Sequence, residues 1–203
     1  MFEGPFAHSI VKNAKEKHLV KINLINIRDF GIGSHKTVDD TPYGGGIGMV
    51  LRVDVLHQAI NHAIQSFPTK NRLVILTSAK GETYNQEKAR SFAKVEHLII
   101  VCGHYEGIDE RIVHYIDQEI SIGEYVLTGG EIPAMVITDS VIRLVKDVLK
   151  PEATRDESYS IDDHIKEYPH YTRPETYEDH KVPEILLSGN HKKITEWRSS
   201  KRR

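Results

Sequence analysis

Two long apolar stretches in the first half of the chain predict strands that are buried on both faces. Residues 72–78 and 97–103 carry almost uninterrupted apolar side chains, as parallel strands covered by helices do. Residues 21–30 instead alternate apolar and polar side chains, which predicts a half-buried strand. A further extended run begins at Ser121 and breaks after Leu127 on two glycines and a proline.

Apolar residues at helical spacing separate these runs. They predict helices over residues 54–67, 85–95 and 138–149, and Asp139 is placed to cap the last of them. Strands that alternate with helices form βαβ units. The expected fold class is therefore α/β, with a parallel sheet covered on both faces.

The pattern changes after Lys150. Charged residues and prolines become frequent and the periodicity fades, which predicts a linker followed by irregular chain, with a short helix at 189–198. The sequence thus predicts an α/β domain over residues 1–150, a linker over 151–163 and a small part over 164–203.

The composition is that of a globular protein. The 203 residues are 39% apolar and 28% charged, which is enough to bury a core. No apolar run is long enough for a membrane helix and the first residues do not resemble a signal peptide, so the expected location is the cytoplasm. The 27 basic and 29 acidic residues nearly cancel, so contact with nucleic acid would depend on local clusters such as 191–203.

Several chemistries find no support in the motifs. The single cysteine, Cys102, lies in an apolar run and is interpreted as a buried small side chain without a redox role. The twelve histidines show no metal-binding spacing, so no metal is expected. A phosphate-binding loop of the G-x-x-x-x-G-K-[ST] type and a G-x-S-x-G elbow are also lacking.

Three glycine-containing segments are candidates for binding a ligand through the backbone. Residues 39–50 contain four glycines, but Met49 breaks the dinucleotide fingerprint and a surface loop is the favoured interpretation. Residues 103–107 and 121–135 lie at predicted strand ends, where α/β proteins bind ligands, although tight turns explain their glycines equally well. Together the segments predict one pocket lined by backbone, suited to an adenine or ribose edge.

Five motifs give the sequence a specific resemblance. The segments "VDDTPYGGGIGMV", "CGHYEGIDERI", "SIGEYVLTGGEIPAM", "PHYTRPE" and "VPEILLSGNHKKITEWR" closely resemble the bacterial tRNA (guanine-N1)-methyltransferase family of the SPOUT superfamily. The resemblance implies a deep trefoil knot, a homodimer, a small mainly helical C-terminal part, and S-adenosylmethionine bound by the knot loops. The methyl group would go to N1 of the guanosine immediately 3′ of the tRNA anticodon, when another guanosine precedes it, which protects the reading frame.

The resemblance also implies roles for individual residues. Cofactor binding would fall to Leu76, Thr77, Ala79, Gly103, Tyr105, Glu106, Gly107, Ile122, Gly123, Glu124, Tyr125, Val126, Leu127, Gly129, Gly130 and Pro133. Contacts to tRNA would fall to Tyr43, Gly44, Gly45, Gly46, Lys192, Lys193 and Arg198, with Lys201, Arg202 and Arg203 as further basic residues of the tail. Ala79 departs from the family, which usually has proline there.

Transfer to guanine N1 requires a base for the N1 proton and a cation for the charge that develops on O6. By the resemblance, Arg143 is the cation. The base is Glu157 or its neighbour Asp156, and Glu157 is favoured because the Ser158-Tyr159 pair fixes the alignment. Taken alone, Arg143 would be a solvated residue opposite an apolar stripe, and 154–159 an ordinary charged linker.

Two alternatives to this enzyme stay open. Family members usually have a strand before the segment that begins at Met1 and further helix after Arg198, so this chain either has a late assigned start or represents a minimal lineage. One alternative is therefore an RNA-binding protein of this fold with impaired catalysis. The other is a methyltransferase of the same fold that acts on a different RNA.

Overall fold

The computed structural model describes residues 1–104, 106–162 and 164–203. The chain divides into two compact units, Met1–Leu149 and Lys150–Arg203, and each is described by itself.

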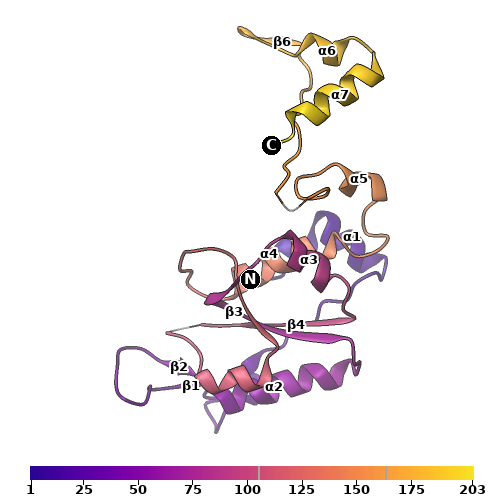
Figure 1. Cartoon of the computed structure of the whole chain (residues 1–203). Coiled ribbons are helices and arrows are strands. Elements are labelled where there is room, and N and C mark those ends of the chain that lie inside the picture. The colour runs from indigo at the N-terminus through magenta and orange to yellow at the C-terminus, as the bar shows by residue number, and fades with distance from the viewer. Residues whose placement is uncertain (105, 163) are drawn as a thin grey trace. The chain divides into compact units, whose positions relative to one another are not determined.

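A three-stranded parallel sheet forms the centre of the first unit (Figure 1). β3 (Arg72–Thr83) lies between β4 (His97–Cys102) and β5 (Gln118–Ser121). Ile75 of β3 is in register with Ile100 on one side and with Gln118 on the other. The two predicted buried strands are confirmed as β3 and β4, because helices cover both faces of the apolar runs. The extended run predicted from Ser121 is wrong: β5 ends at Ser121, and a loop follows.

Helices cover both faces of this sheet. Figure 1 shows α2 (Val53–Ser66) on one side and α3 (Gln86–Phe92) and α4 (Glu131–Ile142) on the other. The first core cluster contains α2 residues such as Leu56 together with Val74 of β3. The second contains Phe92, Ile75 and Ile137. The predicted helices over 54–67 and 85–95 are confirmed as α2 and α3. The predicted sheet with helices on both faces is confirmed as well.

The last predicted helix of this unit begins earlier than expected. Its cap is Gly130 rather than Asp139, which lies inside α4. Glu131 favours the first turn because its charge is opposite to the helix dipole, and Pro133 is tolerated there because first-turn N–H groups need no partner in the helix. Beyond Ile142 the chain continues in turns.

The strand predicted over residues 21–30 does not form. Among the described residues its first part pairs with no strand, and Ile27–Phe30 form a short 3₁₀ helix, η2, capped by the Asn26 side chain. Ile25, Ile27 and Phe30 pack on the cluster that includes α2, while Leu24 is 58% exposed. Packing against a helix therefore replaces pairing with a strand.

The remaining elements of the first unit are short. They are η1 (Pro5–Ala7), α1 (Ser9–Glu16), β1 (Asp39–Asp40), β2 (Val50–Leu51) and η3 (Glu110–Tyr115). β1 and β2 pair antiparallel and enclose the glycine-rich loop 41–49.

The second unit contains α5 (Pro151–Arg155), the antiparallel pair β6 (Thr176–Tyr177) and β7 (His180–Lys181), α6 (Glu184–Leu187) and α7 (His191–Lys201). The short helix predicted at 189–198 is confirmed as α7. The Asn190 side chain caps α7 by accepting from the Lys193 N–H at 3.2 Å. The Lys166 N–H donates to the Arg203 carbonyl at 2.6 Å, which ties the chain after α7 to the segment that follows α5.

Candidate functional site

The carboxyl ends of the three parallel strands meet at one edge of the sheet and enclose a cleft. The cleft has a volume of about 480 Å³, within the usual range for small-molecule sites. Its walls come from residues 76–80 of β3, from 103–112 after β4 and from 119–133 after β5, although not every residue of these ranges contributes. The geometry therefore brings together three segments that are far apart in the sequence.

Gly130 brings two of these segments into direct backbone contact. Its N–H donates to the Gly103 carbonyl at 2.7 Å. The Thr77 hydroxyl, 6% exposed, lies 3.2 Å from the Val101 carbonyl and 3.4 Å from the Gly130 carbonyl. A Cβ atom on Gly130 would lie 2.6 Å from the Gly103 nitrogen and would also collide with the Thr77 hydroxyl. Only a residue without a side chain fits at this crossing.

The loop after β5 is shaped by its own hydrogen bonds. The Ser121 hydroxyl donates to the Gly123 carbonyl at 2.9 Å, and the Tyr125 hydroxyl donates to the Ile122 carbonyl at 3.2 Å. Gly123 has φ +155°, and the Tyr125 ring lies where a Cβ atom of residue 123 would be. The loop therefore folds back on itself and presents backbone groups to the cleft.

The loop after β4 is held by β2. The Leu51 N–H donates to the Gly107 carbonyl at 3.0 Å, and the Asp109 N–H donates to the Leu51 carbonyl at 3.0 Å. The Glu106 N–H donates to the Met49 carbonyl at 3.2 Å. The predicted RNA-contacting residues Tyr43 to Gly46 lie in the loop between β1 and β2, do not line the cleft, and are exposed, with Tyr43 at 102%.

Charged residues gather at one end of the cleft. Lys80 pairs with Glu110 at 2.6 Å and approaches Glu119 at 4.0 Å, and the hydrogen bond to Glu110 raises the pKa of Lys80. Behind the cleft wall, burial raises the pKa of the Cys102 thiol to about 12. This thiol is therefore uncharged at neutral pH.

Most of the predicted cofactor residues line this cleft. They are Leu76, Thr77, Ala79, Gly103, Glu106, Gly107, Ile122, Gly123, Tyr125, Val126, Leu127, Gly129, Gly130 and Pro133. Glu124 is not among the lining residues, and Tyr105 lies outside the described residues. That these residues bind the cofactor stays a prediction, since the geometry places them together without a ligand.

Sequence reasoning missed the polar side chains Lys80, Glu110 and Glu119 of the cleft. Glu119 could have been found from its position near the end of a parallel strand, but residues 118–121 were not recognised as that strand. Glu110 could not have been found in this way, because the sequence of the turn that leads into η3 does not indicate that residue 110 faces the cleft.

The three predicted catalytic residues are placed by different elements. Arg143 is the half-buried residue that follows α4 in the first unit. Asp156 and Glu157 follow α5 in the second unit. The Asp156 carboxylate accepts from the Arg202 guanidinium at 2.7 Å, whereas Glu157 is half-buried and its carbonyl accepts from the Ser160 hydroxyl at 2.6 Å. The Asp156 carboxylate therefore forms an ion pair with Arg202.

The predicted basic residues of the tail lie on α7, where Lys192, Lys193 and Arg198 are exposed. No group of three potential metal ligands occurs within residues 1–104, 106–162 and 164–203. The helices in the described part of the chain are too short or too polar to cross a membrane.

Comparison with known proteins identifies the relationship. A family model described as tRNA (Guanine-1)-methyltransferase TrmD matches residues 1–203. Proteins named tRNA (guanine-N(1)-)-methyltransferase from Carboxydothermus hydrogenoformans and Bacillus pumilus are 53% and 52% identical over 98% of this chain, which covers 77% and 81% of their lengths. The protein of that name from Clostridioides difficile is 49% identical over 98% of this chain and 86% of its own length. The predicted resemblance is confirmed: this chain belongs to the tRNA (guanine-1)-methyltransferase family.

Proposed function

We propose that this chain transfers a methyl group from S-adenosylmethionine to N1 of a guanosine in tRNA, at the position immediately 3′ of the anticodon. The observation that carries the proposal is the cleft at the sheet edge, in a chain about half identical to named tRNA (guanine-N1)-methyltransferases over nearly its whole length. The names of these relatives give the methylated base, guanine, and the methylated atom, N1. The position in the tRNA is inferred from the motifs quoted above.

The cleft suits an adenosyl group. A flat heterocycle with polar edges fits between apolar walls such as Leu76, Ile122 and Pro133, while backbone groups of the two glycine-containing loops offer hydrogen bonds to its edge. Among the described residues, the lining carries three carboxylates, Glu106, Glu110 and Glu119, against one lysine, Lys80, which pairs with Glu110. The excess of negative charge favours a positively charged sulfonium nearby. When bound, S-adenosylmethionine supplies the activated methyl group.

Side chains of the protein would then remove the N1 proton of the guanine and stabilise the negative charge that develops on its O6. Guanine N1 carries a proton near neutral pH, so a carboxylate must accept that proton as the new N–C bond forms. Negative charge develops on O6, and the Arg143 guanidinium is suited to stabilise it. We assign the proton to Glu157, because the Ser158-Tyr159 pair that follows it fixes its alignment with the catalytic carboxylate of the family.

A homodimer is part of the proposal. Ile132 and Val136 of α4 are 47% and 45% exposed, although α4 also buries Ile137 and Val141. A helix with apolar residues all round normally has a partner on each side. Helical spacing puts Arg143 on the same face as Ile132 and Val136, so a second copy that covers this face would meet Arg143 as well.

We further propose that the sheet-edge crossing belongs to a deep trefoil knot and that Lys150–Arg203 serve as the small RNA-binding part. The tight Gly130–Gly103 contact supports the first point, since a knotted chain must bring backbone against backbone. The exposed lysines of α7 support the second. Because N1 lies on the Watson–Crick edge, the target base must leave the anticodon stack before it can react.

The test is methyl transfer from labelled S-adenosylmethionine to an unmodified tRNA with two guanosines at the 3′ edge of the anticodon, followed by analysis of the product nucleoside. We expect N1-methylguanosine at the second guanosine, and loss of transfer when the first is replaced. Transfer that survives this replacement would support an enzyme acting on another RNA. Binding of tRNA and cofactor without turnover would support an RNA-binding protein with impaired catalysis.

A further inference from the structure

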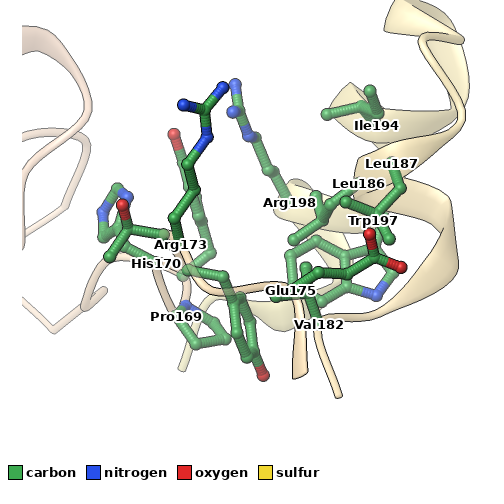
Figure 2. A pocket seen from close by; sticks show the side chains of 13 residues that line it. Pro169, His170, Arg173, Glu175, Val182, Leu186, Leu187, Ile194, Trp197 and Arg198 are labelled. Atoms are coloured by element: carbon green, nitrogen blue, oxygen red, sulfur yellow. The ribbon is translucent and has the colours of Figure 1, made fainter. Parts of the chain in front are cut away.

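The second unit contains a pocket of its own, which has no place in the methyl-transfer chemistry described above. Its volume is about 390 Å³, and residues 168–175 form one side while α6 and α7 form the other (Figure 2). The wall includes Val182, Leu186, Leu187 and Ile194, which are apolar, together with the ring of Trp197. The pocket is thus large enough for a small organic group and partly lined by apolar side chains.

Two arginines line this pocket. Arg173 and Arg198 both line the pocket, and Figure 2 shows their side chains extending in the same direction, while the Glu175 side chain extends in another. Within the described part of the chain neither guanidinium has a carboxylate partner. Two guanidinium groups that line one pocket without a carboxylate partner among the described residues favour the binding of an anion there.

An aromatic ring contacts one of the two arginines. The Arg198 guanidinium lies 5.1 Å from the centre of the Tyr168 ring, and that of Arg202 lies 5.4 Å from the same ring. Stacking on Tyr168 keeps Arg198 beside the pocket without neutralising its charge. The rings of Tyr171 and Trp197, which also line the pocket, lie 6.3 Å apart. The site therefore combines two cations, of which Arg198 is held by a ring, with an aromatic wall.

We propose that this pocket binds one unpaired nucleotide of the RNA, with its phosphate between Arg173 and Arg198 and its base against the aromatic wall. Guanidinium groups bind phosphate oxygens through paired hydrogen bonds, and a free base stacks on aromatic side chains. A nucleotide inside a duplex could offer its phosphate but not the face of its base, so the pocket selects single-stranded chain. The identity of this RNA as tRNA rests on the proposed function.

The test measures binding of the full chain to a short unstructured RNA, and to the same sequence closed into a duplex, by fluorescence anisotropy at several salt concentrations. For Arg173→Gln and Arg198→Gln we expect a Kd for the unstructured RNA that rises about five- to thirty-fold, with a salt slope reduced by about 0.7 for one lost contact to a single strand. Tyr171→Ala should weaken binding at least about five-fold with an unchanged salt slope, because it removes stacking and not charge.

Lys181→Gln is the matched control, since Lys181 is an exposed cation of the same unit outside this pocket. Unchanged affinity for S-adenosylmethionine shows that the first unit is intact in each variant. The inference is overturned if the arginine variants bind the unstructured RNA as the parent does, if duplex binds equally well, or if an acidic peptide competes as strongly as RNA.

The same data separate this inference from the proposed function. If the parent methylates tRNA but the arginine variants keep its affinity and salt slope, the pocket proposal fails while the function stands. If RNA binding by the parent depends on Arg173 but the parent methylates no tRNA, the proposed function is rejected while the proposal for the pocket is supported.

Discussion

Substitution of Gly130 by alanine tests the geometry of the sheet edge most directly. The backbone of Gly130, with φ −82° and ψ −5°, is one that alanine adopts without strain. Any loss must therefore come from the new methyl group. This group would lie 2.6 Å from the Gly103 nitrogen and 2.8 Å from the Cys102 Cα, and it would collide with the Thr77 hydroxyl.

The loss of stability expected for Gly130→Ala depends on whether the atoms around the new methyl group can shift. Carbon atoms in good contact lie about 3.5–4.0 Å apart, so two backbone atoms would each have to shift by about 1 Å. Cys102 is the last residue of β4, which pairs with β3, and Gly103 follows it directly, so neither atom shifts easily. Overpacking of this kind costs about 1–3 kcal/mol, and we expect a value near the upper limit. Because Gly103 lines the cleft, we expect cofactor affinity to fall about tenfold or more.

Urea unfolding gives the free energy of unfolding, and calorimetric titration gives the affinity for S-adenosylmethionine. Gly4→Ala is the matched control, since nothing lies within 4 Å of a Cβ atom there and the backbone is helical. It should change the free energy of unfolding by less than about 0.5 kcal/mol. The double variant Thr77→Ala, Gly130→Ala should stay destabilised because the backbone collisions remain. If Gly130→Ala matched the parent in stability and affinity, the crossing described above would be wrong.

Three further predictions concern single residues. Glu157→Gln should lower the single-turnover rate of methyl transfer about 10²- to 10⁴-fold, and Asp156→Asn much less; a larger loss in the Asp156 variant would exchange the two roles. Arg143→Gln should lower kcat about 10²- to 10³-fold at unchanged affinity for S-adenosylmethionine, and an unchanged kcat would exclude a role at O6. The Cys102 thiol, with a pKa of about 12 against an ordinary value of 9.0, should react with iodoacetamide about 10³-fold more slowly in the folded than in the urea-unfolded chain at pH 8. The same shift makes the folded state lose stability as pH rises from about 9 towards 12, since only the folded chain keeps that proton. Equal alkylation rates in the two states would show that the thiol is accessible.

The elements that sequence reasoning predicted well are those whose pattern depends on burial alone. Strands β3 and β4 are apolar throughout because helices cover both of their faces, and α2 shows a clear apolar stripe because only one of its faces is buried. The loops of the cleft were predicted from glycines at strand ends together with the family motifs. Close backbone contact at Gly130 is the physical reason that such glycines are informative.

The elements that sequence reasoning misplaced depend on long-range contacts. Residues 21–30 alternate like a strand, but Ile25 and Phe30 pack on a helical layer and no strand lies beside them among the described residues. α4 has apolar residues on every side, so periodicity could not locate its start at Glu131. The pocket beside α7 joins residues 168–175 to a helix some twenty residues later, and no local pattern records that contact.

The position of Leu51 links the glycine-rich loop to the cleft. Leu51 pairs with Asp39 on one side and bridges to Ile108 on the other, and its backbone hydrogen bonds reach Gly107 and Asp109. A strand of two residues shared in this way transmits any displacement of loop 41–49 to the wall of the cleft. If RNA orders that loop, the two ligands become thermodynamically coupled. By reciprocity, RNA and cofactor would then each change the affinity of the chain for the other by the same factor.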